Sequence, residues 1–332
     1  MKRSLATALT SVLVTLAVMW AGALAPHAAL PTDIEPSVTT AHFHFYAHGD
    51  VQASVDKIAG PAEERWARLC AELGACGVLK PGERIDVWVA DDPERFASAF
   101  PDGAPMAEWA AGVAFIGARR VVLRAHGSAL FTLRETFDHE LSHILLHEVA
   151  ADGRLPRWFS EGVAIWQSGE GVLGRLETAH LAALTGNLLP MEAIDRRFPN
   201  QGATVSLAYA QSALFTRHLM QRYGAVRVLS LARAIGAGQT FEAAFATSLG
   251  APVSDVFEAW SDGLEGRSTI WVLFSNEGFF WVLMAFLFIF AAIVQLRNRR
   301  LALADMEQEE LAEEALEEIE QARLEGHSPT LH

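Results

Sequence analysis

The first half of the chain alternates between short stretches with a strand pattern and a longer stretch with a helical pattern. Apolar and polar residues alternate over 42–46 and 85–89, as in half-buried strands. Between them, residues 51–74 repeat apolar side chains every three or four positions, which predicts one helix. Two more short strands are expected at 113–115 and 120–123, on either side of a glycine turn. Together these elements predict a small mixed α/β layer.

The second half has a helical pattern. From Thr132 to about Glu265 the apolar positions follow a helical spacing, with turn residues between the helices and no internal repeat. Thr132 and Glu135 have the spacing of a capping box, which starts a helix at that point. The strand at 120–124 closely precedes this helix, and we expect it to offer an edge of the sheet to an extended substrate. The pattern as a whole predicts an α+β fold.

A long uncharged stretch at 278–296 lies towards the end of the chain. Its Phe, Leu, Ile, Val and Trp residues span about 28 Å as a helix, close to the thickness of the hydrocarbon core of a bilayer. Arg297, Arg299 and Arg300 follow directly, and such positive flanks stay in the cytoplasm. The stretch is therefore expected to be a transmembrane helix, with the C-terminus in the cytoplasm and the preceding chain outside it.

The N-terminus has the pattern of an export signal. Lys2 and Arg3 precede an uncharged stretch at 5–24, which is followed by small residues. The segment is either a cleaved signal peptide or an uncleaved anchor, and both direct the following chain out of the cytoplasm. In an exported domain Cys70 and Cys76 can close a small disulfide, and the alternative is two small buried side chains at a helix end.

Negative charge is concentrated at the C-terminus. Of the formal net charge of −14, −9 lies in residues 301–332, where ten acidic residues accompany one arginine, which leaves −5 for the rest. No basic stripe is present, which argues against nucleic-acid binding. The charged helical pattern at 301–324 is typical of a solvated helix or a disordered acidic tail, and a helix that binds a partner is the alternative.

The helix that begins at Thr132 carries His139, Glu140 and His143, which form an HExxH motif. Residues four apart lie one turn apart on the same face, so the two imidazoles can converge on one metal ion at about 2.0–2.1 Å each. Glu140 projects beside the ion and can accept a proton from a water that the metal activates. The spacing predicts a metal site with a general base, as metal-assisted hydrolysis requires.

His147 offers a second histidine pair, because it lies four residues after His143. The residue after His143 is Ile144, which cannot act as a base, and about 12 Å of helix separate His139 from His147. We therefore expect His139 and His143 to bind the ion and His147 to be packed or exposed. Asp138, on the same helix, is expected on the helix surface.

A catalytic zinc ion needs a third protein ligand and an open position. The best candidate is Glu161, which lies eighteen residues after His143 in a segment that begins another helical pattern after Pro156. A carboxylate on an adjacent antiparallel helix can reach the same ion. Glu161 therefore completes the expected ligand set.

Three segments of this chain resemble the gluzincin metallopeptidases of the peptidase MA group, and the resemblance covers about residues 42–265. The segments are HELSHILLH at 139–147, LPRWFSEGVA at 155–164 and AYAQSALFTRHLMQRYG at 208–224. The resemblance implies a zincin-like fold with a helical catalytic layer. The aminopeptidase motif GAMEN is absent, which leaves endopeptidase action more open.

The same resemblance assigns roles to individual residues. It implies one Zn²⁺ ion held by His139, His143 and Glu161, with Glu140 as the general base. It also implies that the hydroxyl of Tyr209 stabilises the oxyanion of the reaction. The implied protein is a zinc metallopeptidase that hydrolyses a peptide or protein substrate. The stretch at 278–296 and the export signal, rather than the resemblance, lead us to expect it to be anchored in the inner membrane with its catalytic domain extracytoplasmic or periplasmic.

Two other functions remain as alternatives. One is a peptidase-like binding module without activity, and the other is a membrane scaffold whose acidic tail recruits a cytoplasmic partner. The expected organisation of the chain is a signal peptide or N-terminal anchor at 1–30, a linker at 31–41, an α/β subdomain at 42–131, a helical catalytic subdomain at 132–266, a transmembrane helix at 278–296 and a cytoplasmic acidic tail at 297–332.

Overall fold

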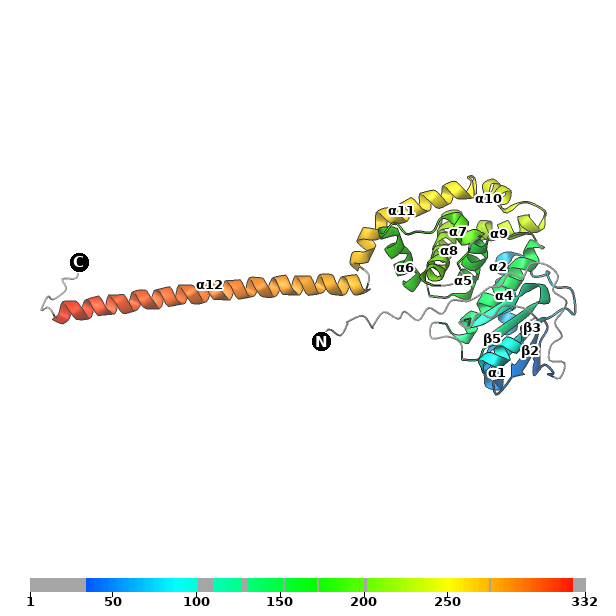
Figure 1. The fold of residues 1–332 in the computed structure, drawn as a ribbon, viewed down its shortest axis with the longest axis horizontal. Coiled ribbons are helices and arrows are strands. Elements are labelled where there is room, and N and C mark those ends of the chain that lie inside the picture. The colour runs from blue at the N-terminus through cyan, green and yellow to red at the C-terminus, as the bar shows by residue number, and fades with distance from the viewer. Residues whose placement is uncertain are drawn as a thin grey trace, which may run out of the picture. The chain divides into compact units, whose positions relative to one another are not determined.

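The structure of the chain is a computed structural model that divides into two compact units, Met1–Thr269 and Ile270–His332. The first unit contains the sheet and most of the helices (Figure 1). The expected export signal at 1–30 lies outside the described residues. These are 34–100, 110–126, 131–151, 153–171, 173–196, 198–199, 202–274 and 276–324.

A five-stranded mixed sheet forms the N-terminal layer and confirms the expected α+β fold (Figure 1). Its order is β1-β2-β3-β5-β4, in which β2, β3 and β5 are parallel while β1 and β4 run antiparallel to their neighbours. The segment expected as a linker contains the short strand β1. These residues form a strand because they pair with β2. The strands are β1 Val38–Thr39, β2 Phe43–His48, β3 Ile85–Ala90, β4 Gly112–Phe115 and β5 Arg120–Arg124.

The expectation that the strand at 120–124 lies at a sheet edge is wrong. Strand β5 lies between β3 and β4, and its Val121, Val122 and Leu123 are fully buried. A continuous apolar run is typical of a strand that is covered on both faces. The edge strand on this side is β4, which approaches the HExxH helix.

The expected helix at 51–74 is two helices, α1 Gln52–Ala59 and α2 Ala62–Leu73. Pro61 lies between them, and a proline cannot donate the backbone hydrogen bond that would continue the first helix. The apolar spacing continues through this break, because both helices pack on the same core. At the end of α2, Cys70 and Cys76 form a disulfide.

The two faces of the sheet contribute to two separate cores. On one face, side chains such as Phe43, Val87 and Leu123 join a large cluster with α1, α2 and the HExxH helix. On the other face, Trp88 and Val122 pack in a smaller cluster with Phe96 of α3 and its neighbours. The sheet is therefore a middle layer. Helix α3 spans Pro93–Ser98, and the Asp92 side chain accepts a hydrogen bond from the backbone N–H of Arg95 at its start.

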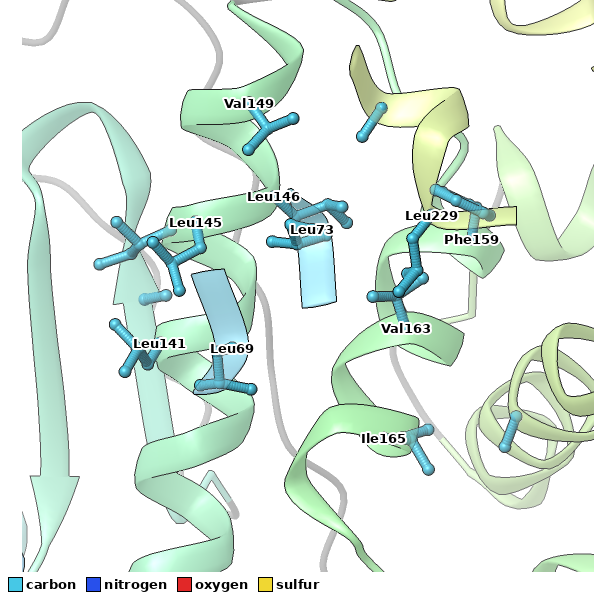
Figure 2. Close-up of a cluster of buried hydrophobic side chains, with 14 of the residues drawn as sticks. Leu69, Leu73, Leu141, Leu145, Leu146, Val149, Phe159, Val163, Ile165 and Leu229 are labelled. Atoms are coloured by element: carbon cyan, nitrogen blue, oxygen red, sulfur yellow. The ribbon is translucent and has the colours of Figure 1, made fainter. Parts of the chain in front are cut away.

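The helical layer continues the larger core. Figure 2 shows apolar side chains of α2, α4, α5 and α9 meeting there, among them Leu73, Leu146, Val163 and Leu229. This packing fixes the two helices that carry the HExxH motif and Glu161. The helices are α4 Leu133–Ala150, α5 Arg157–Ser168, α6 Leu173–Leu184, α7 Met191–Asp195, α8 Ala203–Tyr223, α9 Ala225–Gly236, α10 Phe241–Leu249 and α11 Val253–Phe274.

One long helix, α12, spans Asn276–Leu324. Its segment Phe280–Arg300 is long and apolar enough to cross a membrane, and none of it is buried inside the protein. The expected transmembrane stretch at 278–296 and the charged helical pattern after it therefore belong to one continuous helix.

Candidate metal centre

Helix α4 presents the two histidines of the motif to one point. Thr132 and Glu135 form the expected capping box, in which each side chain binds the other residue's backbone N–H. This cap starts α4 at Leu133, and the helical repeat then places the rings of His139 and His143 on one side, with their centroids 4.8 Å apart. Both side chains are completely buried.

Helix α5 brings Glu161 to the same point. Its Oε2 atom lies 3.5 Å from Nε2 of His139 and 3.5 Å from Nε2 of His143. The three side chains form a buried group whose ligand atoms all lie within 4.8 Å of one another. The carboxylate expected eighteen residues after the motif thus meets the imidazoles, as the sequence predicts.

The group fits a metal ion better than it fits a hydrogen-bonded cluster. Nε2 of His139, Nε2 of His143 and Oε2 of Glu161 are buried and have no hydrogen-bond partner among the described residues. Buried polar atoms are rarely left without a partner. In a tetrahedral zinc site with ligand distances of about 2.0–2.1 Å, ligand atoms lie about 3.3–3.4 Å apart, close to the 3.5 Å between Oε2 of Glu161 and Nε2 of each histidine. A zinc ion therefore matches both the donor set and its geometry.

The opposite ring nitrogens of the histidines are held by other side chains. Nδ1 of His139 lies 2.6 Å from Oε1 of Glu170, and the other carboxylate oxygen of Glu170 accepts a hydrogen bond from Arg175. Nδ1 of His143 lies 2.9 Å from Oγ of Ser160. These contacts fix the ring orientation and leave each Nε2 for the metal.

Sequence reasoning missed Glu170 and Arg175. Glu170 lies in a glycine-flanked turn after α5, and nothing in its spacing from the HExxH motif distinguishes it from a surface glutamate. Ser160 could have been proposed from the sequence, because it directly precedes Glu161 and so lies in the first turns of the same helix. Glu170 could only be found once the fold had brought the end of α5 beside α4.

The electrostatic surroundings of His143 and Glu161 suit metal binding. Burial lowers the pKa of His143, so the neutral ring that binds metals is favoured. Burial alone would raise the pKa of Glu161, but the two imidazoles and Arg157 hold it well below its usual value. Burial also disfavours a charged His139, but the adjacent Glu170 carboxylate outweighs this and raises the pKa of His139 to about 10 in the absence of a metal.

Glu140 lies beside the three ligands with a free carboxylate. It is fully buried, and neither of its oxygens has a hydrogen-bond partner among the described residues. Burial, together with the nearby carboxylates of Glu161 and Glu170, raises its pKa to about 8. Strand β4 passes close by at Gly112, where an added Cβ would lie 3.1 Å from Cγ of Glu140.

Tyr209, from helix α8, reaches the same region through Arg157. The two side chains are hydrogen-bonded, and Arg157 Nε lies 3.4 Å from Oε1 of Glu161. Tyr209 is almost fully buried, and burial together with the charge of Glu161 raises its pKa well above the usual value. The phenol therefore keeps its proton at neutral pH and can donate a hydrogen bond.

Two further residues of α4 can now be placed. Asp138 was expected on the helix surface, and this is wrong. It is buried and forms ion pairs with Arg65 at 2.6 Å and Arg68 at 3.3 Å, both from α2, because this side of α4 packs against that helix. His147 is partly buried and is not one of the three grouped ligands, as expected.

A cavity of about 450 Å³ opens beside His143 and Glu161. Its walls include Ile116 after strand β4, His147 of α4 and Phe198 after α7. A substrate that occupies this cavity would therefore lie against the metal ligands.

A mixed sheet followed by a helical layer, with a buried His-His-Glu group on two packed helices, defines the class of zincin-type metal-dependent hydrolases. A family comparison agrees and is more specific. The model of the Peptidase MA superfamily matches residues 62–266, well over half of the chain, so this protein belongs to that superfamily and is a zinc metallopeptidase. None of the curated proteins compared with the chain matches it.

Proposed function

We propose that this protein is a membrane-anchored peptidase that uses one zinc ion to hydrolyse peptide bonds outside the cytoplasm. The observation that carries the proposal is the convergence of His139, His143 and Glu161, with the buried carboxylate of Glu140 beside them. When bound, a zinc ion supplies Lewis-acid activation of a water molecule and of the scissile carbonyl.

The protein's own residues supply the proton transfers and the positioning. Glu140 accepts the proton of the attacking water and passes it to the leaving amine, since its carboxylate lies beside the ligands and has no hydrogen-bond partner among the described residues. Tyr209 donates a hydrogen bond to the oxyanion that forms at the scissile carbonyl. Glu170 and Ser160 hold the imidazoles in the orientation that binding requires.

The proposed location follows from the C-terminal helix. The segment Phe280–Arg300 is apolar and exposed, and it ends in a cluster of arginines that favours a cytoplasmic C-terminus. The peptidase unit before it would then lie on the opposite side, where the Cys70–Cys76 disulfide is stable. Protease protection of tagged termini in sealed cells and in inverted vesicles tests this orientation.

The central test combines metal analysis with peptide cleavage. We expect the wild-type protein to hold about one zinc ion per chain and to cleave members of a broad peptide library. Glu140→Gln should keep the metal and lose cleavage, whereas His143→Ala should lose both. His147→Ala is the matched control and should keep the metal. A Glu140→Gln protein that cleaves as well as the wild type would contradict the assignment of the base.

The role proposed for Tyr209 has a test of its own. Tyr209→Phe removes only the hydroxyl, so we expect a normal zinc content and a kcat lower by about 10²–10³-fold. An unchanged kcat would reduce Tyr209 to a core aromatic residue, since it also packs edge-on to Phe198.

The alternative functions predict different outcomes. A silent binding module would bind peptides but show no difference between the wild type and Glu140→Gln. A scaffold that acts through its acidic tail would lose its function when 301–332 is deleted, whereas peptide cleavage by the unit before the span should survive that deletion.

A further inference from the structure

The cavity beside the metal centre carries an excess of positive charge. Arg154, Arg157 and Arg196 line it, and its only carboxylates among the described lining residues are Glu161 and Asp195. Glu161 already faces both imidazoles and the Arg157 guanidinium. The net charge that a substrate meets in this cavity therefore depends on which of the arginines pair with Asp195.

Asp195 is fully engaged by two neighbours. Its carboxylate accepts hydrogen bonds from Nη2 of Arg154 at 3.1 and 3.2 Å, and from the backbone N–H of Arg157 at 3.3 Å. Arg196, the next residue, is exposed and forms no ion pair with any residue in the described part of the chain. One guanidinium in the cavity wall thus has no anionic partner among the residues that the structure describes.

Part of the remaining wall is apolar. Leu155 and Phe198 line the cavity, and the Arg157 guanidinium lies 4.2 Å above the centre of the Phe198 ring. This stacking, with the contact to Glu161, holds Arg157 in place. A short aliphatic chain that ends in a negative charge matches such a surface, because its methylene groups contact the apolar wall while its charge meets Arg196.

We propose that this cavity selects substrates that carry a carboxylate next to the scissile bond, with Arg196 as the principal specificity-determining residue. The inference rests on the proposed peptidase function and names its substrate class. The carboxylate has two sources, an acidic side chain or the free C-terminus of a short peptide. Both present the same charge to the guanidinium, and the experiment separates them.

Two sets of internally quenched peptides share one cleaved sequence. In the first set the C-terminus is amidated, and Glu, Gln or Lys is placed at each position that flanks the scissile bond. In the second set all flanking residues are neutral, and the C-terminus is either a free acid or an amide. We expect kcat/KM to be about three- to tenfold higher for the carboxylate in one of these pairs, with Lys the poorest residue in the first set.

The matched variants identify the charge responsible. Arg196→Ala should abolish the preference and Arg196→Glu should invert it towards Lys. Arg227→Glu makes the same change of charge on the exposed surface of α9, outside the cavity, and should leave the preference unchanged. The wild-type preference should also shrink as salt is raised, because Arg196 is exposed to solvent.

Binding to the Glu140→Gln protein gives a readout that does not need catalysis. Fluorescence anisotropy with the same peptides should show tighter binding of the carboxylate form, which Arg196→Glu removes. If the wild type cleaves no peptide, the proposed function fails while this binding measurement still decides the inference. Equal kcat/KM and equal affinity for carboxylate and amide peptides would overturn it, as would an equal effect of Arg227→Glu and Arg196→Glu.

Discussion

Helices α4 and α12 are both long, but the match between their side chains and their surroundings is opposite. In α4 nearly every side chain is buried, including Asp138, His139, Glu140, Ser142 and His143. In α12 the stretch Phe280–Arg300 is apolar and exposed along its whole length. One helix thus places polar groups inside a protein core, and the other places apolar groups outside it.

In the protein core, polar side chains need hydrogen-bond partners, whereas in the hydrocarbon of a bilayer a helix needs side chains without charge. Buried polar groups of α4 have partners: Ser142 donates to Gln167 at 2.7 Å, for example, and His143 contacts Ser160. The polar atoms of α4 that have no partner in the described part of the chain are the Glu140 oxygens, one Asp138 oxygen and the atoms that face the proposed metal. The exposed stretch of α12 carries no charge before Arg297. Transfer of its apolar side chains from water to the hydrocarbon of a bilayer is therefore favourable.

The largest expected effect comes from charging α12. Phe286→Arg combined with Ile289→Arg adds two charges to the span, at about 2.5–3.5 kcal/mol each on insertion scales, so we expect the protein with its N-terminal segment removed to leave the membrane fraction. Sedimentation of carbonate-washed membranes measures this. The double variant Gln308→Arg and Gln321→Arg adds the same charge beyond the span and should remain with the membrane. Retention of the first variant, in a protein whose residues 1–30 are shown by N-terminal sequencing to have been removed, would mean that α12 does not span.

The next effect concerns the metal at α4. Zinc that binds only the folded protein should raise its free energy of unfolding by about 4 kcal/mol at a thousandfold excess over Kd, and a chelator should reverse this. Denaturant unfolding of the wild type with and without zinc measures the difference. His143→Ala should show no zinc response. Equal stabilisation of both proteins would place the bound zinc elsewhere.

A smaller effect is expected from removing a buried charge of α4. Asp138→Ala leaves Arg65 without its partner, and Arg65 is largely buried, so we expect a loss of about 2–4 kcal/mol in the free energy of unfolding. Asp262→Ala, at an exposed position on α11, is the control and should change stability by less than about 0.5 kcal/mol. Similar values for both would show that the buried ion pair contributes nothing.

The smallest effect comes from adding one methyl group. A Cβ at Gly162 would lie 2.0 Å from Oγ1 of Thr216 and 2.6 Å from the backbone oxygen of Ser212, so α5 must move from α8. We expect Gly162→Ala to cost about 1–3 kcal/mol and to weaken zinc binding through the adjacent Glu161. Gly263→Ala, with open space around it in α11, should instead gain about 0.5–1 kcal/mol. Calorimetric unfolding of both variants decides between these signs.

Elements that depend on local spacing could be predicted from the sequence. The capping box at Thr132 and the strands β2 and β3 follow from neighbouring residues, and so does the helical register that aligns His139 with His143. Pro61 is a local signal for the break between α1 and α2, since proline lacks the N–H that a helix requires. The apolar spacing continues past Pro61, and for this reason one helix was predicted.

Features that depend on packing between distant segments could not be predicted in the same way. The position of β5 inside the sheet depends on which strand pairs with β3, and the burial of Asp138 depends on α2 approaching α4. Glu170 contacts His139 although 31 residues separate them in the sequence, and no sequence motif links the two positions.

By itself, the sequence determined that two imidazoles and a carboxylate lie on one helix, and that a charge-free stretch precedes an arginine cluster. Both are properties of consecutive residues, which the helical repeat converts directly into geometry. Only the tertiary structure decided that Glu161, a candidate from the sequence, meets both imidazoles, that Glu170 and Ser160 hold the rings, and that Arg196 lines the cavity without an ion-pair partner among the described residues. Those relations are set by the packing of side chains between helices, and packing joins residues whose separation along the chain carries no signal.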